Sequence, residues 1–321
     1  MRIPSTSTTP TQQNRHQERV HKTAMFSSML KLMGGGGKDT KPKIVPCCRS
    51  GSDAQQGRRM TMEDTHVHFD DISEKYSFPK DITRAFYAVY DGHGGRRAAE
   101  AAERFLHECI LKSEELKKNL TDDEVLEVMK GAFKRTDSII MEQSRVQGWN
   151  DGCTAVAALI LNTTLYIGNL GDAEAVIGRQ KSEGLVAECV TYKHKPNSPE
   201  ERERIEKAGG HVVFGRVLGS LAVSRALGDS EFKMPRNKAQ DDFVSSVPFL
   251  KSYPLGPDVP FMIIACDGLW DKVTYQDAVD FVEGLRKSGV NPTDAAKRLV
   301  QKALDAGTLD NVSVIIVYFT W

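Results

Sequence analysis

The sequence lacks the features that cross-link a protein through disulfides, hold a zinc ion or anchor a chain in a membrane. Its six cysteines include no Cys-x-x-Cys pair and no zinc-type spacing. No apolar stretch approaches the length of a membrane span, and the start of the chain lacks the continuous apolar core of a signal peptide. We therefore expect free thiols in a reducing compartment, the cytoplasm or the nucleus, and no transmembrane segment.

The chain also lacks an excess of charge of either sign. Lys plus Arg and Asp plus Glu each number 43, so the formal net charge is zero. This balance gives no support for binding to nucleic acid or to a membrane surface. It hides an asymmetry, however, because residues 1–48 carry eight basic and two acidic residues, which leaves a charge of −6 for residues 49–321.

The first part of the chain differs from the rest in composition. Residues 1–48 are polar, poor in aromatic residues and glycine-rich at 34–37, so we expect a disordered basic extension. Residues 49–321 are continuously patterned, and no Pro/Ser-rich linker divides them. We expect this second part to form one folded domain.

Helical and strand patterns are interspersed along this domain. Helix start and stop signals predict helices over residues 96–112, 121–143, 199–208 and from 292 to the glycine at 307. Short apolar runs predict strands at residues 65–69, 85–90, 154–161, 165–170, 174–179, 261–266 and 312–317. The turns at residues 162–164 and at Gly171-Asp172 predict that the middle three of these strands form an antiparallel meander. Together the patterns predict an α+β fold of stacked antiparallel sheets covered by helices.

Acidic residues recur at the ends of the predicted strands. Asp91 follows one strand and Asp267 another, whereas Glu63-Asp64 and Asp310 each precede a strand. A buried carboxylate is costly unless it is paired or bound to a metal. Several converging carboxylates therefore indicate hard divalent ions, Mg²⁺ or Mn²⁺, rather than zinc. Each acid taken alone also fits a solvated turn residue.

Seven motifs occur in order along the chain. They are Arg59-x-x-Met62-Glu63-Asp64, Asp91-Gly92-His93-Gly94-Gly95, Asp151-Gly152-Cys153-Thr154-Ala155, Gly168-Asn169-Leu170-Gly171-Asp172, Leu221-Ala222-Val223-Ser224-Arg225-Ala226-Leu227-Gly228-Asp229, Asp267-Gly268-Leu269-Trp270-Asp271 and Asp310-Asn311-Val312. This series resembles the metal-dependent protein serine/threonine phosphatases of the type 2C family. The resemblance covers residues 50–319, almost all of the predicted folded domain.

The resemblance implies that residues 49–321 form a catalytic domain with a four-layer α-β-β-α sandwich, in which two mainly antiparallel sheets are flanked by helices. It also implies two Mg²⁺ or Mn²⁺ ions per active site. Asp91 would bridge the two ions, and Asp64 would orient a metal-bound water. The other ligands implied are Glu63 and the Gly92 carbonyl for one ion, and Asp267 and Asp310 for the second.

The chemistry implied by the resemblance is phosphomonoester hydrolysis. Two divalent ions lower the pKa of a bridging water and offset charge on the phosphate, so no Cys or Ser nucleophile is needed. A leaving Ser or Thr alkoxide is basic, and we expect His93 to give it a proton; the alternative is a turn histidine bonded within its own loop. Arg59 carries the planar guanidinium that holds phosphate oxygens, and the adjacent Arg58 is expected to be a surface residue.

Some positions depart from the family pattern. Glu174 stands where the family usually has arginine, and we expect altered surface recognition rather than lost chemistry. Some family members bind a weak third ion through an extra pair of acids. Asp271 matches one acid of this pair. Asp151 is the candidate for the other, but its offset from Gly152-Cys153-Thr154 differs from the family pattern, so its part in that site stays open. Residues 191–233 resemble the variable flap beside the catalytic cleft, whose charged helix is either a solvated face or a substrate-docking surface.

The sequence thus predicts a monomeric Mg²⁺/Mn²⁺-dependent phosphatase that acts on phosphoserine and phosphothreonine in phosphorylated protein substrates, with no nucleic-acid partner. Two alternatives are a catalytically inactive scaffold and a small-molecule phosphomonoesterase on the same fold. The presence of every expected metal ligand argues against the first, and the flap-like segment argues against the second.

Overall fold

A computed structural model describes residues 45–78, 83–117, 120–234 and 241–321. The chain divides into two units, residues 1–44 and residues 45–321, and only the second is described below. The predicted disordered extension lies outside the described residues, apart from its last four positions. The first strand of the second unit begins at Cys47.

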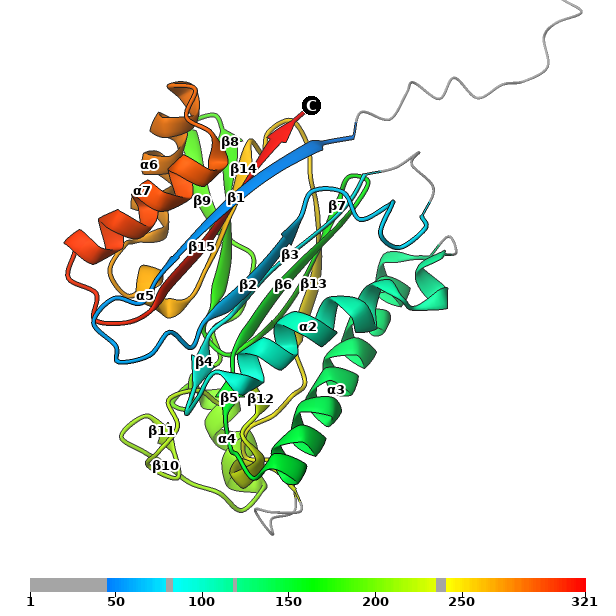
Figure 1. The fold of residues 1–321 in the computed structure, drawn as a ribbon. Coiled ribbons are helices and arrows are strands. Elements are labelled where there is room, and N and C mark those ends of the chain that lie inside the picture. Colours follow the sequence, from blue (N-terminus) through cyan, green and yellow to red (C-terminus); the bar gives the residue numbers. More distant parts are fainter. Residues whose placement is uncertain (1–44, 79–82, 118–119, 235–240) are drawn as a thin grey trace, which may run out of the picture. The chain divides into compact units, whose positions relative to one another are not determined.

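Two antiparallel five-stranded sheets form the centre of this unit (Figure 1). The first sheet has the order β1-β15-β14-β8-β9 and the second the order β13-β7-β6-β3-β2. The strands of the first are β1 (Cys47–Gln55), β15 (Val312–Thr320), β14 (Phe261–Ala265), β8 (Glu174–Lys181) and β9 (Gly184–Cys189). Those of the second are β13 (Phe249–Pro254), β7 (Thr164–Leu170), β6 (Ala155–Leu161), β3 (Arg84–Tyr90) and β2 (Thr65–Phe69).

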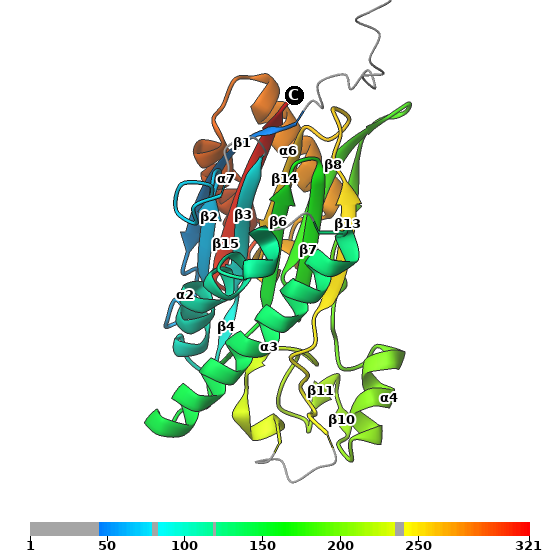
Figure 2. The same cartoon turned by 90° about the vertical axis from the view of Figure 1, so that its right-hand side faces the viewer.

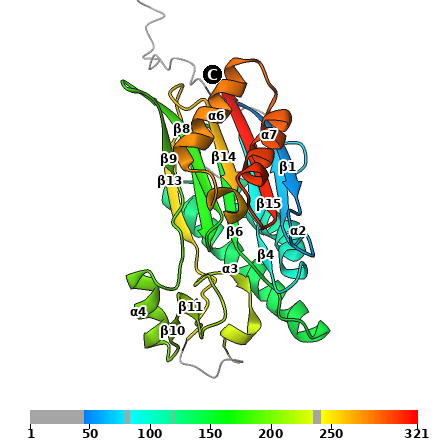
Figure 3. The same ribbon diagram turned by 90° about the vertical axis from the view of Figure 1, so that its left-hand side faces the viewer.

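Helices cover the outer face of each sheet, which confirms the predicted four-layer α-β-β-α sandwich. Helices α2 (Arg97–Leu111) and α3 (Asp122–Gln147) lie over the second sheet, as Figure 2 shows. Helices α6 (Tyr275–Lys287) and α7 (Pro292–Asp305) lie over the first sheet (Figure 3). The side chains of β14 alternate accordingly, because Ile264 packs between the two sheets whereas Ile263 packs under α6 and α7.

The sequence signal at the start of α3 holds in the structure. The Thr121 hydroxyl accepts a hydrogen bond from the Glu124 N–H at 3.3 Å, and the Glu124 carboxylate accepts one from the Thr121 N–H at 2.8 Å. This is the predicted capping box, and it satisfies N–H groups that have no partner inside the helix. Helix α3 runs four residues beyond the predicted end and stops at Gly148, whose φ of 72° is left-handed.

The predicted three-stranded meander is wrong in its third strand. Strands β6 and β7 form the expected hairpin, but β7 pairs on its other side with β13. Strand β8 instead pairs with β14 and β9 in the opposite sheet. The turn after β7, where Gly171 has a φ of +84°, therefore carries the chain from one sheet to the other. This crossing places Asp172 between the ends of the two sheets.

A smaller region adjoins this end of the two sheets. A short sheet has the order β12-β5-β4, from β12 (Leu227–Gly228), β5 (Gly152–Cys153) and β4 (Gly92–His93). The segment between β9 and β13 contains α4 (Pro199–Lys207), the hairpin β10 (Val212–Val213) and β11 (Arg216–Val217), and the 3-10 turn η2 (Ser230–Phe232). It has a small apolar core of its own, and it corresponds to the predicted flap. The remaining elements are η1 (Glu114–Lys117) and α5 (Asp267–Trp270).

Among the described helices, none combines the length and the apolar character needed to span a bilayer.

The inter-sheet layer should carry a large part of the stability of the domain. Ile264 is fully buried in it, so Ile264→Ala should lower the free energy of unfolding by about 2–5 kcal/mol through lost contacts and a residual cavity. Val146→Ala at an exposed position of α3 is the control and should change it by no more than about 0.5 kcal/mol. Urea denaturation measures both values. Similar losses in the two variants would show that the layer between the sheets is not the main core.

Candidate active site

Carboxylates from three separate strands meet at one end of the sandwich. Asp91 directly follows β3, whereas Asp172 follows β7 by two residues and Asp267 follows β14 by two residues. One carboxylate oxygen from each of these three residues lies within 4.8 Å of the other two. Because the strands are fixed by their sheets, the three oxygens are held close together even though their charges repel.

A cavity of about 300 Å³ surrounds this acid cluster. Seven of the predicted site residues line it, namely Arg59, Glu63, Asp91, Gly92, His93, Asp267 and Asp310. The flap contributes Arg216 and the residues 221–223 to the same cavity. The structure thus brings together residues that are up to 251 positions apart in the chain.

The eighth predicted residue, Asp64, lies beneath the cavity and not in its lining. One of its oxygens is close to Asp91 and to the thiol of Cys266, within 4.8 Å. Its carboxylate accepts a hydrogen bond of 2.8 Å from the Ser313 hydroxyl. Burial raises the pKa of the Asp64 carboxyl to about 6, against the opposing effect of that hydrogen bond. Asp64 therefore adjoins the acid cluster through Asp91.

Burial and mutual repulsion make the acid cluster electrostatically unfavourable. Burial, with added repulsion from Asp64, raises the pKa of the Asp91 carboxyl well above its usual range. Burial, followed by repulsion from Asp172, raises the pKa of Asp267 to about 7. A nearby positive charge would reverse both effects, because it favours the ionised form. The site is therefore suited to holding cations.

Close approach of backbone segments shapes the cavity. A Cβ at Gly92 would lie 2.4 Å from the Glu63 carbonyl oxygen, and one at Gly57 would lie 2.1 Å from the Asp310 carbonyl oxygen. Both positions therefore require glycine, and Gly57 also has a left-handed φ of +65°. The main-chain carbonyl of Asp91 is fixed in turn by a 2.9 Å hydrogen bond from the Thr154 N–H.

Asn311 positions the acids that come from the two ends of the chain, a role that the sequence analysis did not assign. Its side-chain oxygen accepts a hydrogen bond from the Glu63 N–H at 2.8 Å. Its side-chain amide donates to the carbonyls of Gln56 and Thr61, at 2.8 and 3.0 Å. The buried Asn311 amide thus connects the loop that carries Glu63 to the segment that carries Asp310.

Asp172 is the acid that the sequence analysis missed. It ends the motif Gly168-Asn169-Leu170-Gly171-Asp172 and lies two residues beyond a strand, a signal similar to the one that identified Asp91. The assumed hairpin turn concealed it, because a turn between paired strands would have put it at the surface. In the structure Asp172 is buried, belongs to the acid cluster and forms an ion pair with Lys195.

The partner of His93 comes from the end of the flap. The Nε2 atom of His93 lies 2.9 and 2.8 Å from the two carboxylate oxygens of Asp229. Burial alone would lower the pKa of the His93 imidazole, but the Asp229 carboxylate outweighs burial and raises this pKa. The alternative of a histidine bonded within its own loop is therefore wrong, since Asp229 lies 136 positions further along the chain.

Asp229 is itself held in an uncommon backbone conformation. Its φ of 55° and ψ of 49° are left-handed, and its N–H donates to the Asp151 carbonyl at 3.2 Å. The preceding Gly228 N–H donates to the Asp137 carboxylate at 2.9 Å, and Lys233 pairs with the same carboxylate at 2.6 Å. These buried contacts fix the direction in which Asp229 points.

Arg59 contacts one of the predicted metal ligands. Its guanidinium donates to the Asp310 carboxylate at 2.6 Å, and 59% of its side chain is exposed. An ion pair as exposed as this is weak, so the guanidinium can move to another anion. Arg58 is also exposed, as predicted, and it is absent from the residues that line the cavity.

The expected surface role of Glu174 is wrong, because the side chain is buried. Its carboxylate accepts a hydrogen bond of 2.7 Å from the Tyr275 hydroxyl and forms an ion pair of 3.1 Å with Lys193. The negative charge at this position is thus balanced inside the domain and is not displayed to partners.

The two acids considered for a third ion lie in different places. The Asp151 carboxylate accepts a 3.0 Å hydrogen bond from the Arg97 N–H at the start of α2, where it complements the helix N-terminus. It is not among the residues that line the cavity. Asp271 is exposed at the end of α5, and its charge contributes to the raised pKa of Asp267.

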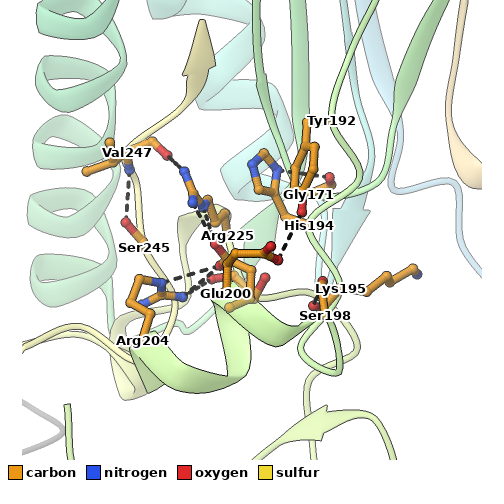
Figure 4. A network of polar contacts seen from close by, with 12 residues as sticks. Gly171, Tyr192, His194, Lys195, Ser198, Glu200, Arg204, Arg225, Ser245 and Val247 are labelled. Atoms are coloured by element: carbon orange, nitrogen blue, oxygen red, sulfur yellow. Dashed lines mark hydrogen bonds and ion pairs between the residues drawn. The ribbon is translucent and has the colours of Figure 1, made fainter. Parts of the chain in front are cut away.

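The charged helix α4 is tied into the flap by one buried acid. Glu201 forms ion pairs with Arg204 at 3.1 Å and with Arg225 at 2.5 Å, the pair of arginines seen in Figure 4. Burial opposes ionisation of Glu201, but the Arg225 guanidinium outweighs it and lowers the pKa to about 2. One face of α4 is therefore structural, whereas Glu203 and Lys207 on its other face are solvent-exposed.

Comparisons with known proteins agree with this arrangement. The sequence model of the family described as protein phosphatase 2C matches residues 48–312. The chain is 38% identical over 279 residues to probable protein phosphatase 2C 8 of Arabidopsis thaliana. This match covers 82% of this chain and 76% of that protein. It is 36% identical over 288 residues to the human integrin-linked kinase-associated serine/threonine phosphatase 2C, covering 82% of this chain and 70% of that protein.

Another relative is much longer than this chain. The chain is 36% identical over 298 residues to protein spalten of Dictyostelium discoideum, and the match covers 90% of this chain but 29% of spalten.

Solved structures show the same fold. A serine-threonine phosphatase 2C from Toxoplasma gondii superposes with a TM-score of 0.73 at 23% identity, covering 87% of this chain and 97% of that one. A sex determining protein from C. elegans superposes with the same TM-score at 24% identity, covering 96% and 74%. Given the match of the family model over residues 48–312, the chain belongs to the protein phosphatase 2C family of serine/threonine phosphatases.

Proposed function

We propose that this chain hydrolyses phosphoserine and phosphothreonine in protein substrates with the help of two Mg²⁺ or Mn²⁺ ions. The observation that carries the proposal is the clustering of the Asp91, Asp172 and Asp267 carboxylates in a cavity that also contains Arg59 and His93. We further propose that the enzyme acts as a monomer in the cytoplasm or the nucleus.

The donor set fits hard divalent ions. Its side-chain ligand atoms are carboxylate oxygens held by rigid strand ends, and such oxygens are the ligands that Mg²⁺ and Mn²⁺ prefer. Asp91 would be shared by the two ions, with Glu63 and the Gly92 carbonyl on the side of one ion and Asp267 and Asp310 on the side of the other. When bound, the ions would lower the pKa of a water and offset charge on the phosphate. Asp172 is a further candidate ligand, and Asp271 could contribute to a weak third ion.

The remaining residues bind the substrate and move protons. Arg59 would exchange its exposed pairing with Asp310 for the phosphate oxygens, which its planar guanidinium can hold at two points. Asp64, fixed by Ser313 beneath the cavity, would orient the attacking water. His93, whose protonated form Asp229 stabilises, would donate a proton to the leaving alkoxide.

The site geometry bears on the two alternatives. An inactive scaffold would not need seven predicted site residues gathered in one cavity. A small-molecule phosphomonoesterase would favour an enclosed pocket, whereas this cavity is bordered by the flap and by a half-exposed Arg59. We therefore favour phosphorylated proteins as substrates.

Removing a central carboxylate should abolish catalysis and leave the fold intact. Asp91→Asn and Asp267→Asn should each stop Mn²⁺-dependent phosphate release from a phosphothreonine peptide, because the ions would lose a charged ligand. Asp280→Asn on the exposed surface of α6 is the matched control and should retain full activity. Circular dichroism checks that all three variants fold. Undiminished turnover in either cluster variant would contradict the assigned metal ligands.

Loss of His93 should matter most where the leaving group is a poor one. His93→Ala should slow hydrolysis of a phosphothreonine peptide by about 10²–10⁴-fold, because the alkoxide then leaves without a proton. Nitrophenyl phosphate needs no such help, so its hydrolysis should slow much less. Steady-state kinetics with both substrates gives the comparison. Equal losses for the two would exclude a proton donor at this position.

The charge of Asp229 should set the pH range over which His93 is protonated. Asp229→Asn removes the carboxylate that raises the pKa of His93, so this pKa should fall. The alkaline limb of the kcat profile with a phosphothreonine peptide should then move to lower pH by roughly one unit or more. The same limb should be absent in His93→Ala. An unmoved limb in Asp229→Asn would show that the pair does not control this ionisation.

A further inference from the structure

A lysine side chain reaches into the acid cluster from the segment that precedes α4. The Nζ atom of Lys195 forms an ion pair with a carboxylate oxygen of Asp172. The Asp172 side chain is 3% exposed and that of Lys195 is 33% exposed, so the pair spans the boundary between the cluster and solvent. A charge pair at this depth is screened much less than a surface pair.

The acid that Lys195 pairs with is one of the three clustered carboxylates. Oxygens of Asp172, Asp91 and Asp267 lie within 4.8 Å of one another, so a cation at Asp172 is also near the other two. Attraction from Asp267 and Asp271 acts on the same ammonium group. Lys195 therefore supplies one positive charge on the Asp172 side of the cluster.

The backbone that carries Lys195 is fastened beside Asp172. The His194 N–H donates to the Gly171 carbonyl at 2.8 Å, and the His194 carbonyl accepts from the Ser224 N–H at 3.2 Å. Figure 4 shows the His194 ring beside Gly171, with the Lys195 side chain pointing away from Arg204 and Arg225. The neighbouring Tyr192 is bonded through both its N–H and its carbonyl to the Asn169 side chain. These contacts hold the lysine within reach of Asp172.

We propose that Lys195 is an internal counter-ion that occupies the Asp172 side of the acid cluster and weakens the binding of a divalent ion there. The proposal rests on the metal centre assigned above. A divalent ion that uses Asp172 as a ligand must displace the ammonium group of Lys195. Because both the ion and the ammonium group are positively charged, they cannot share this carboxylate without repelling each other. Lys195 would thereby limit the number of tightly bound ions to the two that are held by Asp91, Glu63, Asp267 and Asp310.

The chain contains a matched control two residues away. Lys193 forms an ion pair of 3.1 Å with Glu174, and the two side chains are 32% and 3% exposed. The pair thus resembles that of Lys195 and Asp172 in residue types and burial. Glu174 does not belong to the group of clustered carboxylates found among the described residues. Loss of Lys193 should therefore disturb a buried carboxylate without changing the ion-binding cluster.

The test compares Mn²⁺ binding to wild type, Lys195→Met and Lys193→Met by isothermal titration calorimetry of the full chain. We expect two tight ions in wild type and in Lys193→Met. In Lys195→Met a further ion should bind, or the weakest ion should bind roughly tenfold or more tightly, because a repelling charge at contact distance is gone. Identical binding in Lys195→Met and wild type would overturn the proposal, as would an equal change in both lysine variants.

Absence of Mn²⁺ binding in wild type would instead refute the proposed metal centre, so the two failures are distinguishable.

Thermal unfolding in EDTA and in Mn²⁺ gives a second readout that does not involve catalysis. Lys195→Met should have a lower Tm than wild type in EDTA, and Mn²⁺ should remove most of this difference, since binding to the folded state stabilises it. The Lys193→Met deficit should be the same in both conditions. If Lys195→Met does not fold, Lys195→Arg provides a second test, because it keeps the positive charge. Lys195→Arg should bind the same number of ions as wild type. An additional ion in Lys195→Arg would refute the role of the charge.

Discussion

The repulsion between carboxylates gathered at one end of the sandwich is the constraint on which the active site depends. Asp91, Asp172 and Asp267 come from strands of both sheets, and their oxygens lie within 4.8 Å of one another. Such a cluster is stable only where the rest of the fold prevents the strand ends from separating. The apolar layer between the two sheets does this, because burial of its side chains favours the packed arrangement.

The cluster also needs positive charge, and the chain supplies part of it. Lys195 pairs with Asp172, and Arg59 pairs with Asp310. Neither side chain is fully buried, so both can move aside when other charged groups enter. In this interpretation the acids, and not the basic residues, are the fixed part of the site. The Glu63 N–H donates a hydrogen bond to the Asn311 side chain, and the Ser313 hydroxyl donates one to Asp64, so both acids are held in place around the cluster.

Much of the fold and site was predictable from local patterns, and the failures have specific physical causes. Strand ends identified Asp91 and Asp267, since a carboxylate directly after an apolar run is unusual without a partner. Asp172 carried a similar signal, two residues after an apolar run, but a tight turn after a strand has the same sequence pattern whether the chain returns to the same sheet or crosses to the other. Only the pairing of β8 with β14 distinguishes the two cases.

The Asp229 partner of His93 was not predictable, because nothing local to either residue indicates a contact across 136 positions. The burial of Glu174 likewise depends on Lys193 and Tyr275, which lie in other elements.

The central claim is that the clustered carboxylates hold divalent ions, and a crystal structure of the protein grown with Mn²⁺ tests it most directly. Anomalous scattering locates Mn²⁺ independently of any assumption about the ligands. We predict two Mn²⁺ ions in the cavity, held by carboxylate oxygens that include those of Asp91 and Asp267. Strong Mn²⁺ peaks located away from Asp91 and Asp267, or no peak in the cavity at saturating Mn²⁺, would contradict the account.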